Sequence, residues 1–244
     1  GVASSVANTP LLQVYGSEAV FNSGTSNYVS LSFDPNTANK FVAVYRDVSN
    51  SNYGTAIVGT ISGNSISFGS EVVFNAGTTT YTQVSFDPNN AGKVVVAYGD
   101  GSAGSDGMAI VGTVSGTSIS FGSEVVFNSG STGYIYIDFD PSSSGKFVIA
   151  YQDASNANYG TAIVGTVSGT SISYGSEVVF AAADTNVSAI SFDANASGKF
   201  VIFYTDGGNS NYGTAIVGTL SGTSTSYGSE VVFNSGNSSY SWSE

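Results

Sequence analysis

Tyrosines recur at two places in the repeating pattern of this chain, and their surroundings would suit carbohydrate recognition. Aromatic rings stack on the apolar faces of sugars, while amides and carboxylates bind hydroxyl groups. The first set is Tyr28, Tyr81, Tyr134 and Tyr240, and the second is Tyr53, Tyr159 and Tyr212, which follow Asn52, Asn158 and Asn211. We expect both sets to emerge on one rim as a repeated glycan-binding surface. The alternative is that these tyrosines only cap the ends of strands.

The loops before the second set contain oxygen ligands that could bind a cation. Acidic residues stand there among Ser, Asn and Gly, and such spacing can bind Ca²⁺. The candidate ligands are Asp47, Asp100, Asp106, Asp153 and Asp206. Ordinary Asx turns account for the same residues equally well. Apart from this calcium, the sequence predicts no cofactor.

Several kinds of catalysis are excluded by composition. The chain contains no Cys and no His, so it can form neither a His-based nor a Cys-based nucleophilic triad, nor a thiolate metal site. A glycosidase with paired carboxylates needs a unique constellation of acids, whereas most acids here recur from repeat to repeat. We therefore expect that the protein is not an enzyme.

Charge limits the partners of the chain. The net charge is −12, with only five basic residues, which argues against nucleic acid and anionic membrane surfaces. No apolar stretch reaches the roughly 18 residues of a membrane-spanning helix. We expect neither nucleic-acid binding nor membrane insertion.

A fixed repeat organises the whole sequence. The glutamate of a Gly-Ser-Glu motif falls every 53 residues, at Glu18, Glu71, Glu124, Glu177 and Glu230. A period of this length is typical of propellers and other repeat architectures. We expect residues 1–244 to form a single domain without an internal linker.

Each repeat contains four segments with the pattern of a β-strand. In the first full repeat, residues 28–33 alternate between apolar and polar, whereas residues 40–45 and 55–61 are apolar on both faces. A Ser-Gly-Asn-Ser turn leads into a fourth strand, residues 66–74, in which Gly69 marks a bulge or kink. Two central strands that are apolar on both faces need a neighbouring sheet on each side.

These patterns predict an all-β fold, a β-propeller of four-stranded antiparallel blades. Residues 11–21 match a fourth strand and residues 240–244 match a first strand, so five blades are expected, with the last shared between the termini. That blade would lack its second strand. The alternative is an open repeat array.

The repeat resembles those of known propellers. The run from Ser-Phe-Asp-Pro, through Gly-Lys-Phe-Val-Ile-Ala-Tyr-Gln-Asp, to Asn-Tyr-Gly-Thr-Ala-Ile-Val-Gly-Thr is similar to β-propeller repeats of the lectin and Asp-box kind. It is also similar to repetitive segments of marine bacteriophage structural proteins and bacterial surface proteins. Sialidase-type propellers use a cluster of arginines, but this chain has only Arg46, and the one tryptophan, Trp242, is not in an intact Asp-box.

The resemblance and the composition lead to three functional hypotheses. The first is a non-enzymatic structural or adhesive component of an extracellular or virion assembly, such as an appendage, located outside the cell or on the virion surface. Its partners would be other copies of itself or a larger assembly. The second is a multivalent lectin for cell-surface glycans, and the third is a carbohydrate-active enzyme.

Overall fold

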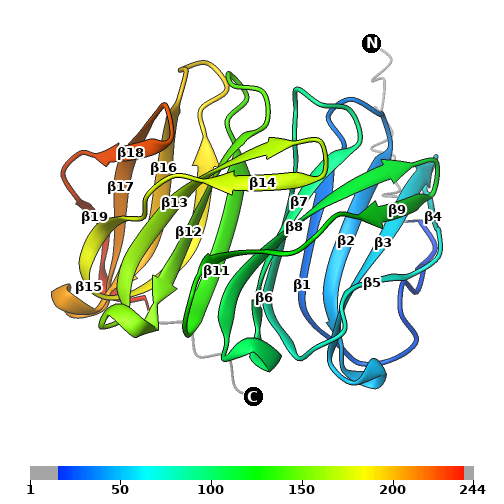
Figure 1. The fold of residues 1–244 in the computed structure, drawn as a ribbon, viewed down its shortest axis with the longest axis horizontal. Coiled ribbons are helices and arrows are strands. Elements are labelled where there is room, and N and C mark those ends of the chain that lie inside the picture. The colour runs from blue at the N-terminus through cyan, green and yellow to red at the C-terminus, as the bar shows by residue number, and fades with distance from the viewer. Residues whose placement is uncertain (1–15, 239–244) are drawn as a thin grey trace, which may run out of the picture.

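The computed structural model describes residues 16–238, which form four successive β-sheet units (Figure 1). Unit 1 spans residues 26–75, unit 2 spans 79–128, unit 3 spans 132–181 and unit 4 spans 185–237. All strand pairs in these units are antiparallel, which confirms the predicted all-β class. The helices within residues 16–238 are single 3₁₀ turns, and none has the length or hydropathy needed to cross a membrane.

The strands repeat in the same order. Unit 1 contains β1 (Ser26–Phe33), β2 (Lys40–Asp47), η1 (Val48–Asn50), β3 (Tyr53–Ser62), β4 (Ser65–Phe68) and β5 (Val72–Asn75). Unit 2 contains β6 (Thr79–Phe86), β7 (Lys93–Asp100), η2 (Gly101–Ala103), β8 (Asp106–Ser115), β9 (Ser118–Phe121) and β10 (Val125–Asn128). Unit 3 contains β11 (Thr132–Phe139), β12 (Lys146–Asp153), η3 (Ala154–Asn156), β13 (Tyr159–Ser168) and β14 (Ser171–Tyr174). The long β15 (Val178–Phe192) completes unit 3 and begins unit 4, which continues with β16 (Lys199–Asp206), η4 (Gly207–Asn209), β17 (Tyr212–Ser221), β18 (Ser224–Tyr227) and β19 (Val231–Asn237).

The fourth strand of each unit differs from its predicted form. In unit 1 it is split into β4 and β5, and both pieces pair with β3. The prediction of one continuous strand over residues 66–74 is therefore wrong, although the expected interruption at Gly69 is confirmed. Units 3 and 4 also share one nine-stranded sheet, because β15 pairs first with β13 of unit 3 and then with β16 as the first strand of unit 4.

The glycine at this interruption is explained by a close contact. A Cβ atom on Gly69 would lie 1.9 Å from the carbonyl oxygen of Thr117, in the turn of unit 2. Gly122 and Gly175 approach Thr170 and Thr223 in the same way, at 2.2 and 1.8 Å. Glycine is therefore required where each unit meets the next one.

The predicted strand over residues 11–21 is only partly testable. Residues 11–15 lie outside the described part, and residues 16–21 form no strand, so that piece of the prediction is wrong. The segment that contains Phe21 nevertheless packs on unit 1 as the fourth strand of unit 1 packs on unit 2. The ring of Phe21 lies 5.1 Å from that of Tyr45, and Phe74 lies 5.1 Å from Tyr98 in the next unit.

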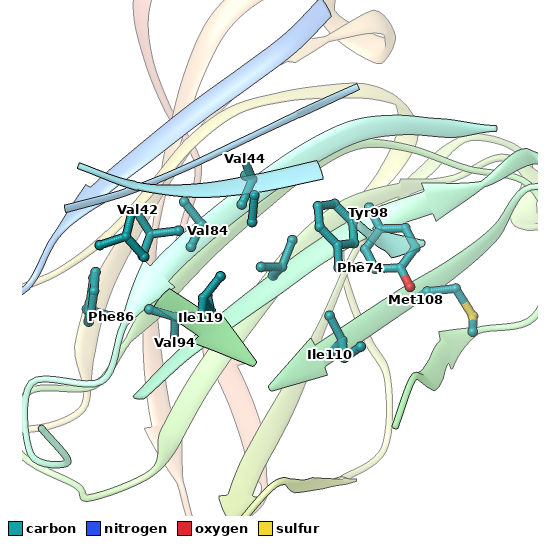
Figure 2. Close-up of a cluster of buried hydrophobic side chains, with 13 residues drawn as sticks. Val42, Val44, Phe74, Val84, Phe86, Val94, Tyr98, Met108, Ile110 and Ile119 are labelled. Atoms are coloured by element: carbon teal, nitrogen blue, oxygen red, sulfur yellow. The ribbon is translucent and has the colours of Figure 1, made fainter. Parts of the chain in front are cut away.

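The core lies between units. Val42, Val44 and Phe74 of unit 1 face Val84 and other apolar side chains of unit 2 (Figure 2). The same kind of cluster joins units 2 and 3 and then units 3 and 4. The first strands lie side by side in the order β1, β6, β11 and β15. Sheets that need a neighbour on each face are thereby covered, as the apolar central strands predict.

The outer face of unit 4 is exposed, whereas that of unit 1 is exposed along β1 only, because Phe41, Tyr45 and Ile57 are buried in a cluster beside Phe21. Leu31 is 56% exposed, whereas its counterpart Val84 is 6% exposed. On the other end, Phe203 and Phe233 of unit 4 are also exposed, and their rings lie 5.2 Å apart. Residues 240–244, the predicted first strand of a fifth blade, lie outside the described residues, so closure into a five-bladed ring stays a prediction.

Candidate functional site

A pocket of about 690 Å³ opens where the first strands of units 1, 2 and 3 begin. Its lining combines aromatic rings with hydroxyl, amide and guanidinium groups and contains no Asp or Glu. The lining residues are Ser26, Asn27, Tyr28, Val29, Arg46, Tyr81, Thr82, Gln83, Tyr134, Ile135 and Tyr136. This volume and composition suit a small polar ligand that also offers an apolar face.

Three tyrosines of the first predicted set form a ladder along this pocket. The ring centroids of Tyr28 and Tyr81 are 5.2 Å apart, and those of Tyr81 and Tyr134 are 5.5 Å apart. The Cζ atom of Arg46 lies 4.7 Å from the centroid of Tyr28, which is cation–π geometry. The structure thus brings together tyrosines that are 53 residues apart in sequence. Their partner Tyr240 lies outside the described residues.

The backbone at these tyrosines is unusual. Tyr28, Tyr81 and Tyr134 have φ values of 51°, 50° and 47°, a left-handed conformation that costs bulky residues free energy. Each tyrosine lies at a β-bulge, where the register between the first and second strands shifts. At the corresponding place in unit 4, Val187 is buried and is not left-handed. The strained backbone therefore accompanies the tyrosine ladder, as is common at binding sites.

Polar groups link the ladder to its surroundings. The Asn27 amide, oriented to satisfy both neighbours, donates to the Ser26 carbonyl at 3.1 Å and accepts from Arg46 Nη2 at 2.8 Å. The Arg46 Nε atom is buried without a hydrogen-bond partner. Ser30 donates from its hydroxyl to Gln83 Oε1 at 3.2 Å.

The second tyrosine set lies at the same end of the units but outside the pocket. Tyr53, Tyr159 and Tyr212 begin the third strand of units 1, 3 and 4. Ser26 pairs with Asp47 and Asp47 pairs with Tyr53, so a full strand separates the two sets. The expected common rim is therefore present, but these rings do not line the pocket with the first set.

The asparagines before the second set have a clear backbone role. Asn52, Asn158 and Asn211 have φ values of 64°, 60° and 59°, which asparagine tolerates better than most residues. The backbone carbonyls of Asn52 and Asn158 accept from the amides of Thr79 and Thr185, at 3.0 Å each. These residues thus join one unit to the start of the next. Contact of these three asparagines with glycans stays a prediction.

The four repeated aspartates of the predicted calcium loops cap the 3₁₀ turns. Asp47 accepts from the backbone amides of Ser49 and Asn50, at 3.0 and 3.1 Å. Asp100, Asp153 and Asp206 accept in the same way from Ser102, Ser155 and Gly208. The fifth candidate, Asp106, accepts instead from the Gly130 amide at 2.7 Å. Within residues 16–238, no three acidic side chains gather as a metal site. Calcium binding here stays a prediction.

A smaller cavity, of about 230 Å³, lies where the first strands end. Asp138 lines it and accepts from the backbone amides of Phe139 and Phe192, at 3.0 and 2.8 Å. Burial raises the pKa of Asp138, and these hydrogen bonds partly oppose the rise. Since its polar groups are satisfied within the protein, this cavity is a weaker candidate than the tyrosine pocket.

Arg46 and Gln83 are pocket residues that the sequence interpretation missed. One signal was present: arginine occurs once, at a repeat position that holds Gly99, Gln152 and Thr205 in the other units. A position that varies within an otherwise regular repeat is a candidate for a specific role. Its place beside the tyrosines, however, depends on how the units pack.

Comparisons with known proteins bear on the fold. No protein-family model and no curated protein matches the chain. Sqt1 from Chaetomium thermophilum superposes with a TM-score of 0.54 at 13% identity, over 79% of this chain and 43% of that one. The chain thus spans less than half the length of Sqt1, and this likeness concerns the fold alone.

Two structures of mutant Aleuria aurantia lectin are similar at a lower level. The complex with alpha-methyl-L-fucoside gives a TM-score of 0.42 at 12% identity, over 86% of this chain and 79% of that one. The complex with Fucalpha1-6GlcNAc gives a TM-score of 0.37 at 12% identity, over 86% of this chain and 96% of that one. These scores are too low to bear on function.

Proposed function

We propose that this protein binds carbohydrate in the tyrosine pocket and does not act on it as an enzyme. The observation that carries the proposal is the ladder of Tyr28, Tyr81 and Tyr134 along one open pocket. Rings supply apolar faces for a sugar, and Asn27 and Gln83 supply amides for its hydroxyl groups. The left-handed tyrosine backbone supports a functional role for these side chains.

Binding to a glycan array, followed by titration calorimetry on the best ligand, tests this proposal. Tyr81 lies in the middle of the ladder, so Tyr81→Leu should weaken binding by at least about tenfold. Tyr159→Leu is the matched control, because Tyr159 lies outside the pocket. If Tyr81→Leu unfolds the chain, Gln83→Ala replaces it. Equal losses from the Tyr81 and Tyr159 variants, or no ligand on the array, would contradict the site, and hydrolysis of an oligosaccharide would contradict the non-enzymatic role.

A structural or adhesive role in an extracellular or virion assembly is the second candidate. The exposed apolar side chains on β1 and on the outer face of unit 4 favour it, since exposed apolar surface marks interaction sites. The fifth blade predicted from the sequence would cover these side chains within one molecule. Light scattering coupled to size exclusion separates the two outcomes: mass that grows with concentration supports assembly, and a monomer at every concentration argues against it.

A further inference from the structure

We infer that the tyrosine pocket selects sugars that carry a carboxylate, which rests on the proposed carbohydrate binding. Arg46 is the only arginine of a chain with net charge −12, and it lines this pocket. Among the described residues that line the pocket there is no Asp, Glu or Lys, so the guanidinium is the one charged group that they contribute. An acidic protein thus presents a local positive charge to a ligand.

The described part of the chain does little to neutralise this charge. Among residues 16–238, Arg46 contacts the Asn27 oxygen and the Tyr28 ring, and its Nε atom is buried without a partner. Asp47 is adjacent in sequence, but its carboxylate accepts from the amides of the following 3₁₀ turn. A partly buried guanidinium without a carboxylate partner is costly, and an anionic ligand would offset that cost.

The equivalent positions in other units are satisfied internally. Gln152 donates from Nε2 to Asp184 Oδ1 and Asn186 Oδ1, at 3.0 and 3.1 Å. Thr205 donates from its hydroxyl to the carbonyl of Ser238 at 3.0 Å. Gly99 has no side chain to satisfy. Arg46 is therefore the one charged member of the set, and among residues 16–238 its guanidinium has only the Asn27 oxygen as a hydrogen-bond acceptor.

A carboxylate matches the donors that Arg46 offers. The guanidinium is a planar fork that binds the two oxygens of a carboxylate with charge-assisted hydrogen bonds. Tyr28 holds it by the cation–π contact, and Asn27 holds one nitrogen, so its orientation is restricted before a ligand arrives. A neutral sugar can use the rings and amides, but it gains nothing comparable from Arg46.

Calorimetric titration with methyl β-D-glucuronide and methyl β-D-glucoside tests the inference. These two sugars differ only at C6, where one has a carboxylate and the other a hydroxymethyl group, and the galacto pair repeats the comparison. The glucuronide or galacturonide should bind at least about tenfold more tightly than its neutral partner, and added NaCl should reduce that difference. Arg46→Gln should remove the preference, so that the acidic and neutral members of each pair bind with equal affinity. Glutamine stands at the equivalent position 152, and thermal unfolding checks that the variant is folded.

Each outcome has a definite meaning. Equal affinity for acidic and neutral sugars would overturn the selectivity and leave the proposed carbohydrate binding intact. If Arg46→Gln still prefers the acidic sugars, another group recognises the carboxylate, and the inferred role of Arg46 would be overturned. No binding of either pair, together with no ligand on the glycan array, would overturn both proposals.

Discussion

Tyr151 donates a hydrogen bond from its buried hydroxyl to Glu177 Oε1 at 2.6 Å, linking the second strand of unit 3 to the glutamate of the Gly-Ser-Glu motif. The same bond recurs in every unit. The other pairs are Tyr45 with Glu71, Tyr98 with Glu124, and Tyr204 with Glu230. The repeated glutamate is therefore the partner of an otherwise unsatisfied phenol.

Removing this hydrogen bond should destabilise the protein. We expect Tyr151→Phe to lower the free energy of unfolding by about 1 kcal/mol, because Glu177 is exposed and can recover part of the loss from water. Urea denaturation measures the change. Tyr174→Phe is the matched control, since the Tyr174 hydroxyl is buried without a partner and phenylalanine stands at the equivalent positions 68 and 121. Tyr174→Phe should leave the free energy of unfolding unchanged or raise it. A larger loss of stability in Tyr174→Phe than in Tyr151→Phe would contradict this account.

Alkaline pH should weaken the fold through its buried tyrosines. Burial raises the pKa of Tyr227 to about 12, although a hydrogen bond donated by Thr225 opposes part of the rise. Tyrosines of the unfolded chain titrate near pH 10. The folded state then holds this proton more tightly, so its contribution to stability is complete below about pH 10 and is lost as pH rises toward 12. Between pH 8 and pH 12, the free energy of unfolding should fall less steeply for Tyr227→Phe than for the native chain. Parallel curves of free energy against pH would count against this explanation.

Asp138 should make the opposite end of the first strands sensitive to pH. Its pKa is raised by burial, so the folded state favours the protonated form, which contributes stability at low pH that is lost as pH rises above about 4. Serine occupies the equivalent positions 32, 85 and 191, and Ser32 accepts the Phe86 amide at 3.2 Å. Asp138→Ser should therefore gain stability relative to the native chain between pH 4 and pH 7. Thermal unfolding at both values measures this, and a difference that does not change with pH would be evidence against it.

The glycines between units should tolerate no side chain. A Cβ on Gly122 would lie 2.2 Å from the Thr170 carbonyl oxygen, so we expect Gly122→Ala to cost about 1–3 kcal/mol through forced separation of units 2 and 3. Gly228 occupies the same repeat position at the uncovered end, where the nearest atom would be 3.8 Å away. Gly228→Ala should therefore be neutral or slightly stabilising. Chemical denaturation of the two variants compares them directly, and equal losses would show that the contact between units is not the cause.

Much of the fold could be predicted from the sequence because strand signals are local. The second strand, expected over residues 40–45, is Lys40–Asp47 in the structure, and its unbroken apolar pattern correctly indicated a sheet on both sides. The glycine within the predicted fourth strand also indicated an irregularity at Gly69. The complete split of the fourth strand was missed, because a glycine inside an apolar run indicates a bulge as readily as a break.

The candidate site was less predictable because it forms between units. The repeat identified Tyr28, Tyr81 and Tyr134, but only packing of the first strands places their rings in one ladder. The second tyrosine set was grouped with them since both lie at one end of the units. Distance across the sheet, which sequence spacing does not encode, separates Tyr53 from Tyr28 by a strand.

The interfaces between units also determine the order in which the units should unfold. Units 2 and 3 are covered on both faces, whereas unit 4 has one covered face, so nearest-neighbour coupling holds it less strongly. Its amide protons should exchange with solvent ahead of those in β7 and β12. The chain would then lose structure from unit 4 inward, and the tyrosine pocket, built on units 1 to 3, would outlast that first opening.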